Sequence, residues 1–424
     1  MKKVIVQTVS AALLLIGISA YADDESNAVI DREWRAMVEP LAPIGGRLAG
    51  QVQHPNDPQL RQEYYRALFS QLAAGYFALA YADKEYPDLW PYFNEAFNAL
   101  APNPDNDYYV TPIDEKGIYK ISGFRGTVKR IDFQTGTGSF VPRGIVDEDK
   151  LGRTTANHDL DEIPHGKDGS FEVILSAIKP EGYKGSWWEL KPRSTYLFVR
   201  QISYDWLHEV DGRLAIERVD RPAAKPRPSA KAMEANLKAI AAWTEGTVKS
   251  SIDFIDEIRK EMGINKVAYK DLTLNGALMT QRYAYGYFSL APDEALIVEA
   301  KVPEKCRYWS IHLLDDYGYS IDWMNRQTNI NGFMAKVDKD GIFRTVISAK
   351  DPGVPNWLDT TGYQTGAIQV RWEKCNEWPG HKTTVVKVAD IRKYLPVETA
   401  AVTLEDREAA IRLRRKGAQM RKRW

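Results

Sequence analysis

The spacing of hydrophobic residues changes along this 424-residue chain. Between residues 28 and 100, hydrophobic side chains recur at every third or fourth position, which places them on one face of a helix. These residues are Leu60, Tyr64, Leu68, Leu72 and Tyr76. From Tyr108 to Arg221, and again from Gly286, hydrophobic and polar residues alternate in short runs instead. A period of two is typical of strands with one buried face.

The alternating runs predict five strands in each of two β regions. In the first region they are residues 119–125, 127–133, 170–176, 194–200 and 213–219. In the second they are residues 295–302, 308–314, 343–348, 367–372 and 383–388. The polar insert 142–169 is expected to form a long loop, and Ser229 is expected to cap a helix between the two regions. The chain has no strand–helix–strand alternation and no Gly-rich phosphate loop, which argues against a nucleotide-binding fold.

The sequence therefore predicts a mainly β protein with added helices, built from two β-sandwich or jelly-roll-like domains. A chain of this length is longer than a domain with one hydrophobic core usually is. The expected divisions are a signal peptide (1–22), an N-terminal helical region (23–100), a first β domain (101–222), a Pro-rich linker and connecting helix (223–262), a second β domain (263–396) and a basic C-terminal helix (397–424).

The N-terminus has the parts of a secretory signal peptide. Lys2 and Lys3 supply positive charge, residues 11–19 form a short apolar run, and Ala20-Tyr-Ala22 offers small residues at the cleavage positions. The run is too short to span about 30 Å of hydrocarbon, and no Cys follows it as a site for a lipid anchor. The segment predicts export to the periplasm or the exterior, with cleavage after Ala22.

Charge is balanced, with 57 Lys and Arg against 57 Asp and Glu. This balance argues against a general nucleic-acid-binding protein. The end of the chain differs, because Thr403–Trp424 holds eight basic and three acidic residues. One interpretation is a solvated amphipathic helix, and the other is a basic arm that makes peripheral contact with an anionic envelope surface.

The segment Asp351–Gly362 has an unusual composition, with two Pro, two Gly, one Trp and two Asp in twelve residues. Pro352 and Pro355 fix φ, whereas Gly353 and Gly362 permit positive φ. The segment is therefore expected to form one defined loop between two strands.

This loop and four other stretches resemble the bacterial family of domain of unknown function 1214. The other stretches are Leu290-Ala-Pro-Asp-Glu-Ala, Cys306-Arg-Tyr-Trp-Ser, Asn325-Arg-Gln-Thr and Val370-Arg-Trp. The first β region and the tail 404–424 are similar to those of longer family members. The resemblance implies a pair of β-sandwich, jelly-roll-like domains, and it brings no established activity and no catalytic residues.

The candidate catalytic residues are His312, Asp351 and Asp359. His312 lies on a predicted strand, opposite the face of Trp309 and Ile311, and it could act as a general base or be a hydrogen-bonded histidine on a polar face. Asp351 and Asp359 could do acid–base work on a glycoside or lyase substrate. Alternatively, they accept backbone N–H groups and hold turns.

The candidate ligand-binding residues are Asn325, Arg326, Trp357 and Arg371. Asn325, Arg326 and Arg371 could form an anion-binding set. A buried ion pair of Arg371 with one of the two loop aspartates is the structural alternative. Trp357 is either a stacking platform for a ligand or a core anchor of the loop.

Cys306 and Cys375 are the two cysteines, and both lie at the edges of predicted strands. In an oxidising compartment they could form a disulfide, and two buried free thiols are the alternative. Two Cys and scattered His do not match a zinc site. No cofactor motif, serine-hydrolase elbow or zinc-protease motif occurs either, so neither a metal nor a cofactor is expected.

Three functions are consistent with these features. The first is a cell-envelope binding or accessory protein that holds a small apolar or carbohydrate ligand in a cleft between the β domains, for which the aromatic content is suitable. The second is a cofactor-free hydrolase or lyase that uses Asp and His of the second β domain. The third is a structural or assembly protein. The lack of a nucleophile motif favours the first, and the sequence indicates no oligomeric state.

We expect the exported protein to begin at Asp23, because cleavage after Ala22 removes the whole apolar run. N-terminal sequencing of protein from a periplasmic fraction tests this expectation. An intact Met1 on protein from washed membranes would contradict it.

Overall fold

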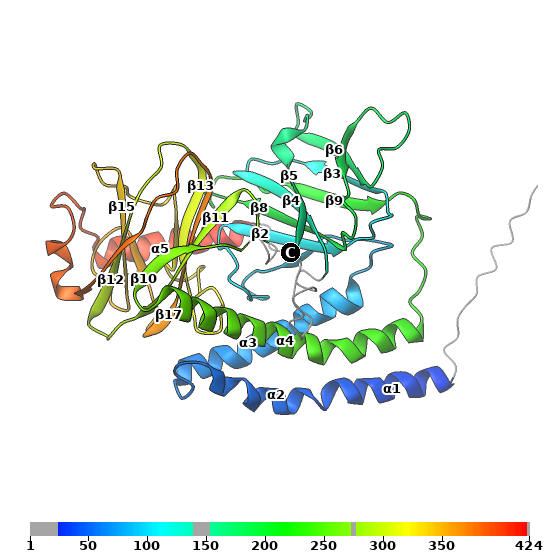
Figure 1. The fold of residues 1–424 in the computed structure, drawn as a ribbon, viewed down its shortest axis with the longest axis horizontal. Coiled ribbons are helices and arrows are strands. Elements are labelled where there is room, and N and C mark those ends of the chain that lie inside the picture. The colour runs from blue at the N-terminus through cyan, green and yellow to red at the C-terminus, as the bar shows by residue number, and fades with distance from the viewer. Residues whose placement is uncertain (1–23, 139–152, 273–276, 422–424) are drawn as a thin grey trace, which may run out of the picture.

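Four β-sheets form the body of the molecule in the part of the chain that the structure describes, residues 24–138, 153–272 and 277–421. In this computed structural model the sheets are arranged as two sandwiches, and helices run along one side of both (Figure 1). The expected fold class is confirmed: mainly β, with N-terminal helices, a connecting helix and a C-terminal helix. The predicted signal peptide, residues 1–22, lies outside the described residues.

The first sandwich pairs a five-stranded with a four-stranded sheet. The five-stranded sheet has the order β1 (Trp90–Tyr92), β2 (Asn106–Pro112), β8 (Tyr196–Ile202), β4 (Arg130–Gly136) and β5 (Thr154–Asp159). The four-stranded sheet has the order β7 (Ser186–Glu189), β6 (Ser170–Ser176), β3 (Tyr119–Phe124) and β9 (Arg213–Arg218). Alternate residues of both sheets, such as Ile121, Phe133 and Val199, fill the core between them.

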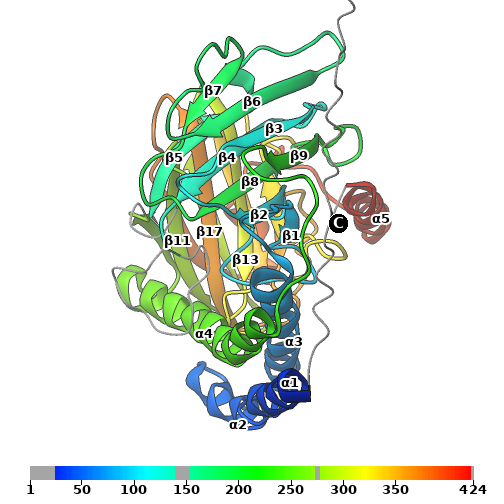
Figure 2. The ribbon, with the colours of Figure 1, turned by 90° about the vertical axis from the view of Figure 1, so that its right-hand side faces the viewer.

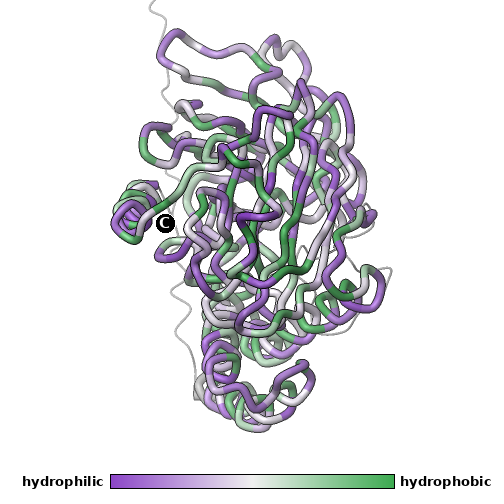
Figure 3. Tube along the Cα trace, turned by 90° about the vertical axis from the view of Figure 1, so that its left-hand side faces the viewer, coloured by the Kyte–Doolittle hydropathy of each residue, from purple (hydrophilic) through white to green (hydrophobic). Residues whose placement is uncertain are grey.

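The second sandwich also pairs a five-stranded with a four-stranded sheet. Its five-stranded sheet has the order β10 (Lys266–Lys270), β11 (Gln281–Ser289), β17 (Thr365–Cys375), β13 (Cys306–Leu314) and β14 (Asn329–Asn331). Its four-stranded sheet has the order β16 (Trp357–Asp359), β15 (Ile342–Ser348), β12 (Glu294–Lys301) and β18 (Lys382–Lys387). Hydrophobic and hydrophilic residues alternate along the central strands, as Figure 3 shows.

A helical layer covers one side of both sandwiches (Figures 1 and 2). It consists of α1 (Asp24–Val38), α2 (Leu41–Arg47), α3 (Pro58–Tyr76) with the short π-helix η2 (Phe77–Tyr81), and α4 (Ala230–Met262). Ser229 caps α4 by accepting a hydrogen bond from the N–H of Ala232, as the sequence predicts. Trp243, Val248 and Ile252 of α4 join the same hydrophobic core as Trp309 and Trp372 of the second sandwich. The helices are thus part of the core rather than an appendage.

The structure differs from the sequence-based expectation at several places, and the strands β7, β10, β11, β14 and β16 were not predicted. The N-terminal helices end at Tyr81 and residues 90–92 form an edge strand, because Pro87 and Pro91 cannot continue a helix. The insert 142–169 was expected to be a loop but contains β5 and the short turn η4 (Leu160–Glu162), while its residues 142–152 lie outside the described part. Strand β2 is buried along almost its whole length, so it lacks the alternation that would predict it.

A buried network of charges joins the two sandwiches. Arg130 on β4 forms ion pairs with Asp132 (2.6 Å) and Asp159 (3.5 Å) of its own sandwich, and with Glu373 on β17 of the other. Arg130, Asp132 and Glu373 are almost completely buried. Lys374 of the second sandwich also reaches Asp159, at 2.9 Å. One cluster of opposite charges therefore sits where the two five-stranded sheets meet.

Helix α5 (Leu404–Met420) ties the sandwiches together on another side (Figure 2). Arg407 binds Asp351 at 2.9 Å, Arg414 donates to the carbonyl of Trp323 at 2.5 Å, and Arg421, just after the helix, binds Asp107 at 3.1 Å. The spacing of seven residues puts Arg407 and Arg414 on one face of the helix, and Arg421 follows its end. These three basic residues point into the protein, so they contribute nothing to a basic outer surface.

Cys306 on β13 lies opposite Cys375 on β17, and the structure has a disulfide between them. Among the described residues, no helix is long and apolar enough to cross a membrane.

We expect Arg130→Met to destabilise the protein by about 3–5 kcal/mol, because it leaves three buried carboxylates without their shared cation. The shift of the urea unfolding midpoint measures this. Arg282→Met is the matched control, since Arg282 is exposed on β11 and makes a cation–π contact with Trp378; it should cost less than about 1 kcal/mol. Equal effects of the two substitutions would show that the network does not stabilise the interface.

Candidate functional site

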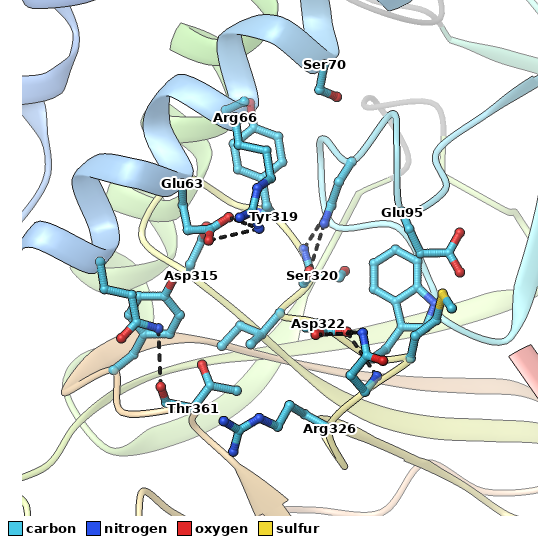
Figure 4. A pocket seen from close by; sticks show the side chains of 18 of the residues that line it. Glu63, Arg66, Ser70, Glu95, Asp315, Tyr319, Ser320, Asp322, Arg326 and Thr361 are labelled. Carbon is cyan, nitrogen blue, oxygen red and sulfur yellow. Dashed lines mark hydrogen bonds and ion pairs between the residues drawn. The ribbon is translucent and has the colours of Figure 1, made fainter. Parts of the chain in front are cut away.

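A cavity of about 420 Å³ opens between α3, the segment that follows β13 and the loop that follows β16 (Figure 4). Helix α3 contributes one polar face to it. Gln59, Glu63, Arg66 and Ser70 line the cavity and follow each other at spacings of three and four, which aligns them along the helix. Trp323 and Tyr363 add aromatic surface.

Asp315 lines the cavity from a tight turn at the end of β13, near Glu63 of α3 (Figure 4). Its carboxylate accepts hydrogen bonds from the N–H groups of Tyr317 (2.9 Å) and Tyr319 (3.0 Å), while Gly318 takes a positive φ of 75° in the turn. Burial raises the pKa of the Asp315 carboxyl well above its usual value, although these N–H groups oppose the shift. Asp315 is thus held rigidly and retains its proton more strongly than an exposed aspartate.

Glu63 and Tyr319 are the other perturbed groups of the cavity. Burial raises the pKa of Glu63; the ion pair with Arg66 at 3.0 Å opposes this rise, and the charge of Asp322 adds to it. Burial also raises the pKa of Tyr319 well above its usual value, and its buried hydroxyl has no hydrogen-bond partner in the described part of the chain. A buried hydroxyl without a partner costs free energy, so a group that binds in the cavity could satisfy it.

Hydrogen bonds hold the walls of the cavity together. The side chain of Asn98 donates to the carbonyl of Ser320 (2.7 Å) and accepts from its N–H (3.0 Å). Gln59 donates to the carbonyl of Thr361 at 3.2 Å, a bond that Figure 4 shows beside Thr361. Helix α3, the segment before β2 and both loops of the second sandwich are therefore fixed to one another around a preformed space.

Two of the candidate ligand-binding residues, Asn325 and Arg326, line this cavity. Asn325 is held by Asp322, which accepts from both its N–H and its side-chain amide at 3.0 Å. Arg326 forms an ion pair with the buried Asp359 at 3.0 Å, and Asp359 also accepts from the N–H of Thr361 at 2.7 Å. Asp359 therefore supports the rim of the cavity.

The remaining candidates lie elsewhere. His312 and Arg371 are in contact with each other, with 2.9 Å between Nδ1 and Nη1, and both are buried beneath the first sandwich. Asp351 holds a turn through the N–H of Gly353 and pairs with Arg407. The three candidate catalytic residues are thus dispersed over three places, and Arg371 pairs with neither loop aspartate.

Trp357 lies in the core of the second sandwich. It is buried in a cluster with Ile297, Val346 and Val386, and its Nε1 donates to the carbonyl of Ser348 at 3.0 Å. The Arg407 guanidinium lies 5.1 Å from its ring centroid. This placement agrees with the anchor interpretation of Trp357 and places it away from the cavity lining.

Sequence reasoning missed Glu63 and Tyr319 as site residues. Helix α3 was interpreted only through its hydrophobic spacing, and the polar positions between those residues form the face that meets the cavity. No group of three or more His, Cys, Asp or Glu side chains among the described residues is arranged to hold a metal ion.

The protein thus consists of two β-sandwiches and has a polar cavity beneath a helical layer. Residues 289–372, which lie in the second sandwich, match the model of the family described as "Protein of unknown function (DUF1214)". The resemblance seen in the sequence is thereby confirmed.

One solved structure shares the architecture. An uncharacterized protein from Burkholderia cenocepacia is 28% identical, with a TM-score of 0.78, over 86% of this chain and 99% of that chain. A protein from Vibrio parahaemolyticus is 11% identical, with a TM-score of 0.42, over 76% of this chain and 98% of that chain. A search of curated proteins gives no match.

We expect Trp357→Ala to destabilise the protein by about 3–5 kcal/mol, because it removes a large buried side chain and leaves a cavity. Urea unfolding followed by circular dichroism measures the change. Trp34→Ala is the control, since Trp34 is 56% exposed on α1; it should change stability by less than about 1 kcal/mol. A Trp357→Ala protein as stable as this control would contradict the anchor role.

Proposed function

We propose that this protein is an exported binding protein of the cell envelope and that its ligand is a small carbohydrate held in the cavity beside α3. The observation that carries the proposal is the preformed polar cavity of about 420 Å³ with aromatic surface and an unsatisfied Tyr319 hydroxyl. Its volume falls within the range of about 300–1,000 Å³ that small-molecule sites occupy. The N-terminal segment supports export.

The lining favours a carbohydrate over an apolar ligand. Sugar hydroxyls both donate and accept, and the cavity offers carboxylates, amides and hydroxyls from Glu63, Asp322, Asn325 and Ser70. These groups already have partners within the protein, such as Arg66 for Glu63 and Asp322 for Asn325, but an apolar ligand would leave their remaining hydrogen-bonding capacity unused. Trp323 supplies an aromatic surface against which the C–H face of a sugar ring can pack.

The charge of the cavity argues against an anionic ligand. The lining includes four acidic side chains, Glu63, Glu95, Asp315 and Asp322. It includes two guanidinium groups, and both are already paired, Arg66 with Glu63 and Arg326 with Asp359. A neutral or amino sugar suits this balance of charge better than a sugar acid or a phosphate.

A catalytic alternative has one specific observation in its favour. Asp315 and Glu63 both have raised carboxyl pKa values in the same cavity, and the charge of Glu63 contributes to the shift of Asp315. A carboxyl group with a raised pKa holds its proton to higher pH and could act as the general acid of glycoside cleavage. This alternative replaces the set of His312, Asp351 and Asp359, which are dispersed.

We expect isothermal titration of the protein with a panel of neutral and amino mono- and disaccharides to detect at least one ligand. Ser70→Trp should weaken that binding at least about tenfold, or about 1.4 kcal/mol, because the indole fills the cavity from α3. Gln62→Trp is the matched control, since it adds the same side chain on an exposed position of the same helix, and it should bind like the unchanged protein.

Two results would overturn the binding proposal: no binding by any saccharide at millimolar concentration, or equal binding by Ser70→Trp and Gln62→Trp. Chromatography of the recovered sugars distinguishes the catalytic alternative. Intact sugars support a binding protein. Cleaved disaccharide, formed by the unchanged protein and lost in Glu63→Gln, would make the protein a glycoside hydrolase.

A further inference from the structure

A second cavity, of about 120 Å³, lies between the two sandwiches and is distinct from the one beside α3. Its walls come from β2 and β8 of the first sandwich, from β11 and β17 of the second, and from Leu100 to Pro102 and Leu272, Ala277 and Leu278. Aromatic rings form much of the lining. They belong to Phe93, Tyr108, Phe198, Tyr283 and Tyr285.

Arg371 brings a positive charge to this cavity. It is buried, and its guanidinium donates to Nδ1 of His312 and to the carbonyl of Ala101, both at 2.9 Å. Within the described residues, no carboxylate lies in ion-pair distance of it. Other buried arginines differ, since Arg130 and Arg421 each pair with an aspartate. A buried charge without a counter-charge is strongly unfavourable.

The groups around Arg371 do not supply the missing negative charge. Burial, assisted by the Arg371 charge, lowers the pKa of His312 well below its usual value, so the ring is neutral. Because a guanidinium only donates, Nδ1 of His312 accepts and its proton sits on Nε2. Burial raises the pKa of Tyr108 and of Tyr285, so both phenols keep their protons. The local charge is therefore positive.

The cavity also contains an unsatisfied polar side chain. Gln369 is buried in the lining, and its amide nitrogen contacts the Tyr285 hydroxyl, while its Oε1 has no hydrogen-bond partner among the residues that the structure describes. On the opposite side, Arg200 of β8 lines the cavity with its guanidinium 4.5 Å from the Phe198 ring centroid. Asp132 is 3.8 Å from Arg200, so this second cation is only loosely compensated.

The lining of this cavity also contains residues with an unusual backbone conformation. Phe93, Leu100 and Ala101 all line the cavity and all have positive φ, of 56°, 53° and 58°. Residues other than glycine adopt this conformation at a cost, and such residues gather at functional sites. At Ala101 the result is a carbonyl directed at Arg371.

We propose that this cavity between the sandwiches binds a short-chain carboxylate, whose carboxylate group pairs with Arg371. The volume is smaller than the engineered apolar cavity of about 150 Å³ that holds benzene, so the ligand has only a few heavy atoms. A hydroxyl on the ligand would donate to Oε1 of Gln369. A 2-hydroxy acid such as glycolate therefore fits better than acetate.

Binding at this site would make the stability of the whole molecule depend on the concentration of a small metabolite. Arg200 belongs to the first sandwich and Arg371 to the second, so an anion between them adds a contact across the interface. A ligand that binds only the assembled state stabilises it in proportion to the logarithm of its concentration.

Thermal unfolding of the mature chain in the presence of sodium acetate, glycolate, chloride or phosphate, at equal ionic strength, tests the proposal. Glycolate should raise the melting temperature by about 2 °C or more and acetate by less, while chloride and phosphate should leave it unchanged. Arg371→Met should abolish the shift, and the exposed control Arg282→Met should keep it.

Gln369→Met provides a second variant in case Arg371→Met does not fold. It keeps the side-chain volume and removes the acceptor, so the advantage of glycolate over acetate should disappear. The proposal is overturned if neither carboxylate shifts the melting temperature, if chloride or phosphate gives the same shift, or if both variants respond like the unchanged protein. A saccharide that binds beside α3 does not affect these outcomes.

Discussion

The arrangement of the whole molecule depends on the charges buried between the two sandwiches. Arg130 is surrounded by Asp132, Asp159 and Glu373, and the last of these comes from the other sandwich. Taking so many charges out of water is unfavourable unless each has its partners in place. The two sheets are consequently restricted to one relative position. That position creates the cavity of Arg371, which lies on the same strand as Glu373.

The alternation of residues was sufficient to predict much of the fold and a part of the site. On β13 it placed His312 opposite Trp309 and Ile311, and the structure has these two in the hydrophobic core and His312 on the other face. It could not predict that Arg371, 59 residues further on, is the partner of His312. Such pairing depends on the order of strands in the sheet, where β17 lies beside β13.

Proximity in sequence was misleading for the two loop aspartates. Asp351 and Asp359 are separated by a segment that ends in strand β16, whose pairing with β15 directs them to different partners, Arg407 and Arg326. The sequence patterns did not predict the cavity beside α3, for a related reason. It requires a helix near residue 63, a turn near residue 315 and a loop near residue 361 to meet, and no local pattern encodes that meeting.

The three inward-facing arginines of the α5 region have a consequence for the order of folding. Asp107 and Asp351 are partners of Arg421 and Arg407, and α5 follows every strand of both sandwiches in the chain. Until α5 is synthesised and docked, these two carboxylates lack their cations and Trp206 lacks the guanidinium groups of Arg414 and Arg421 beside its ring. Docking of α5 is thus needed to complete these ion pairs, and a chain that ends before residue 404 leaves Asp107 and Asp351 without their cations.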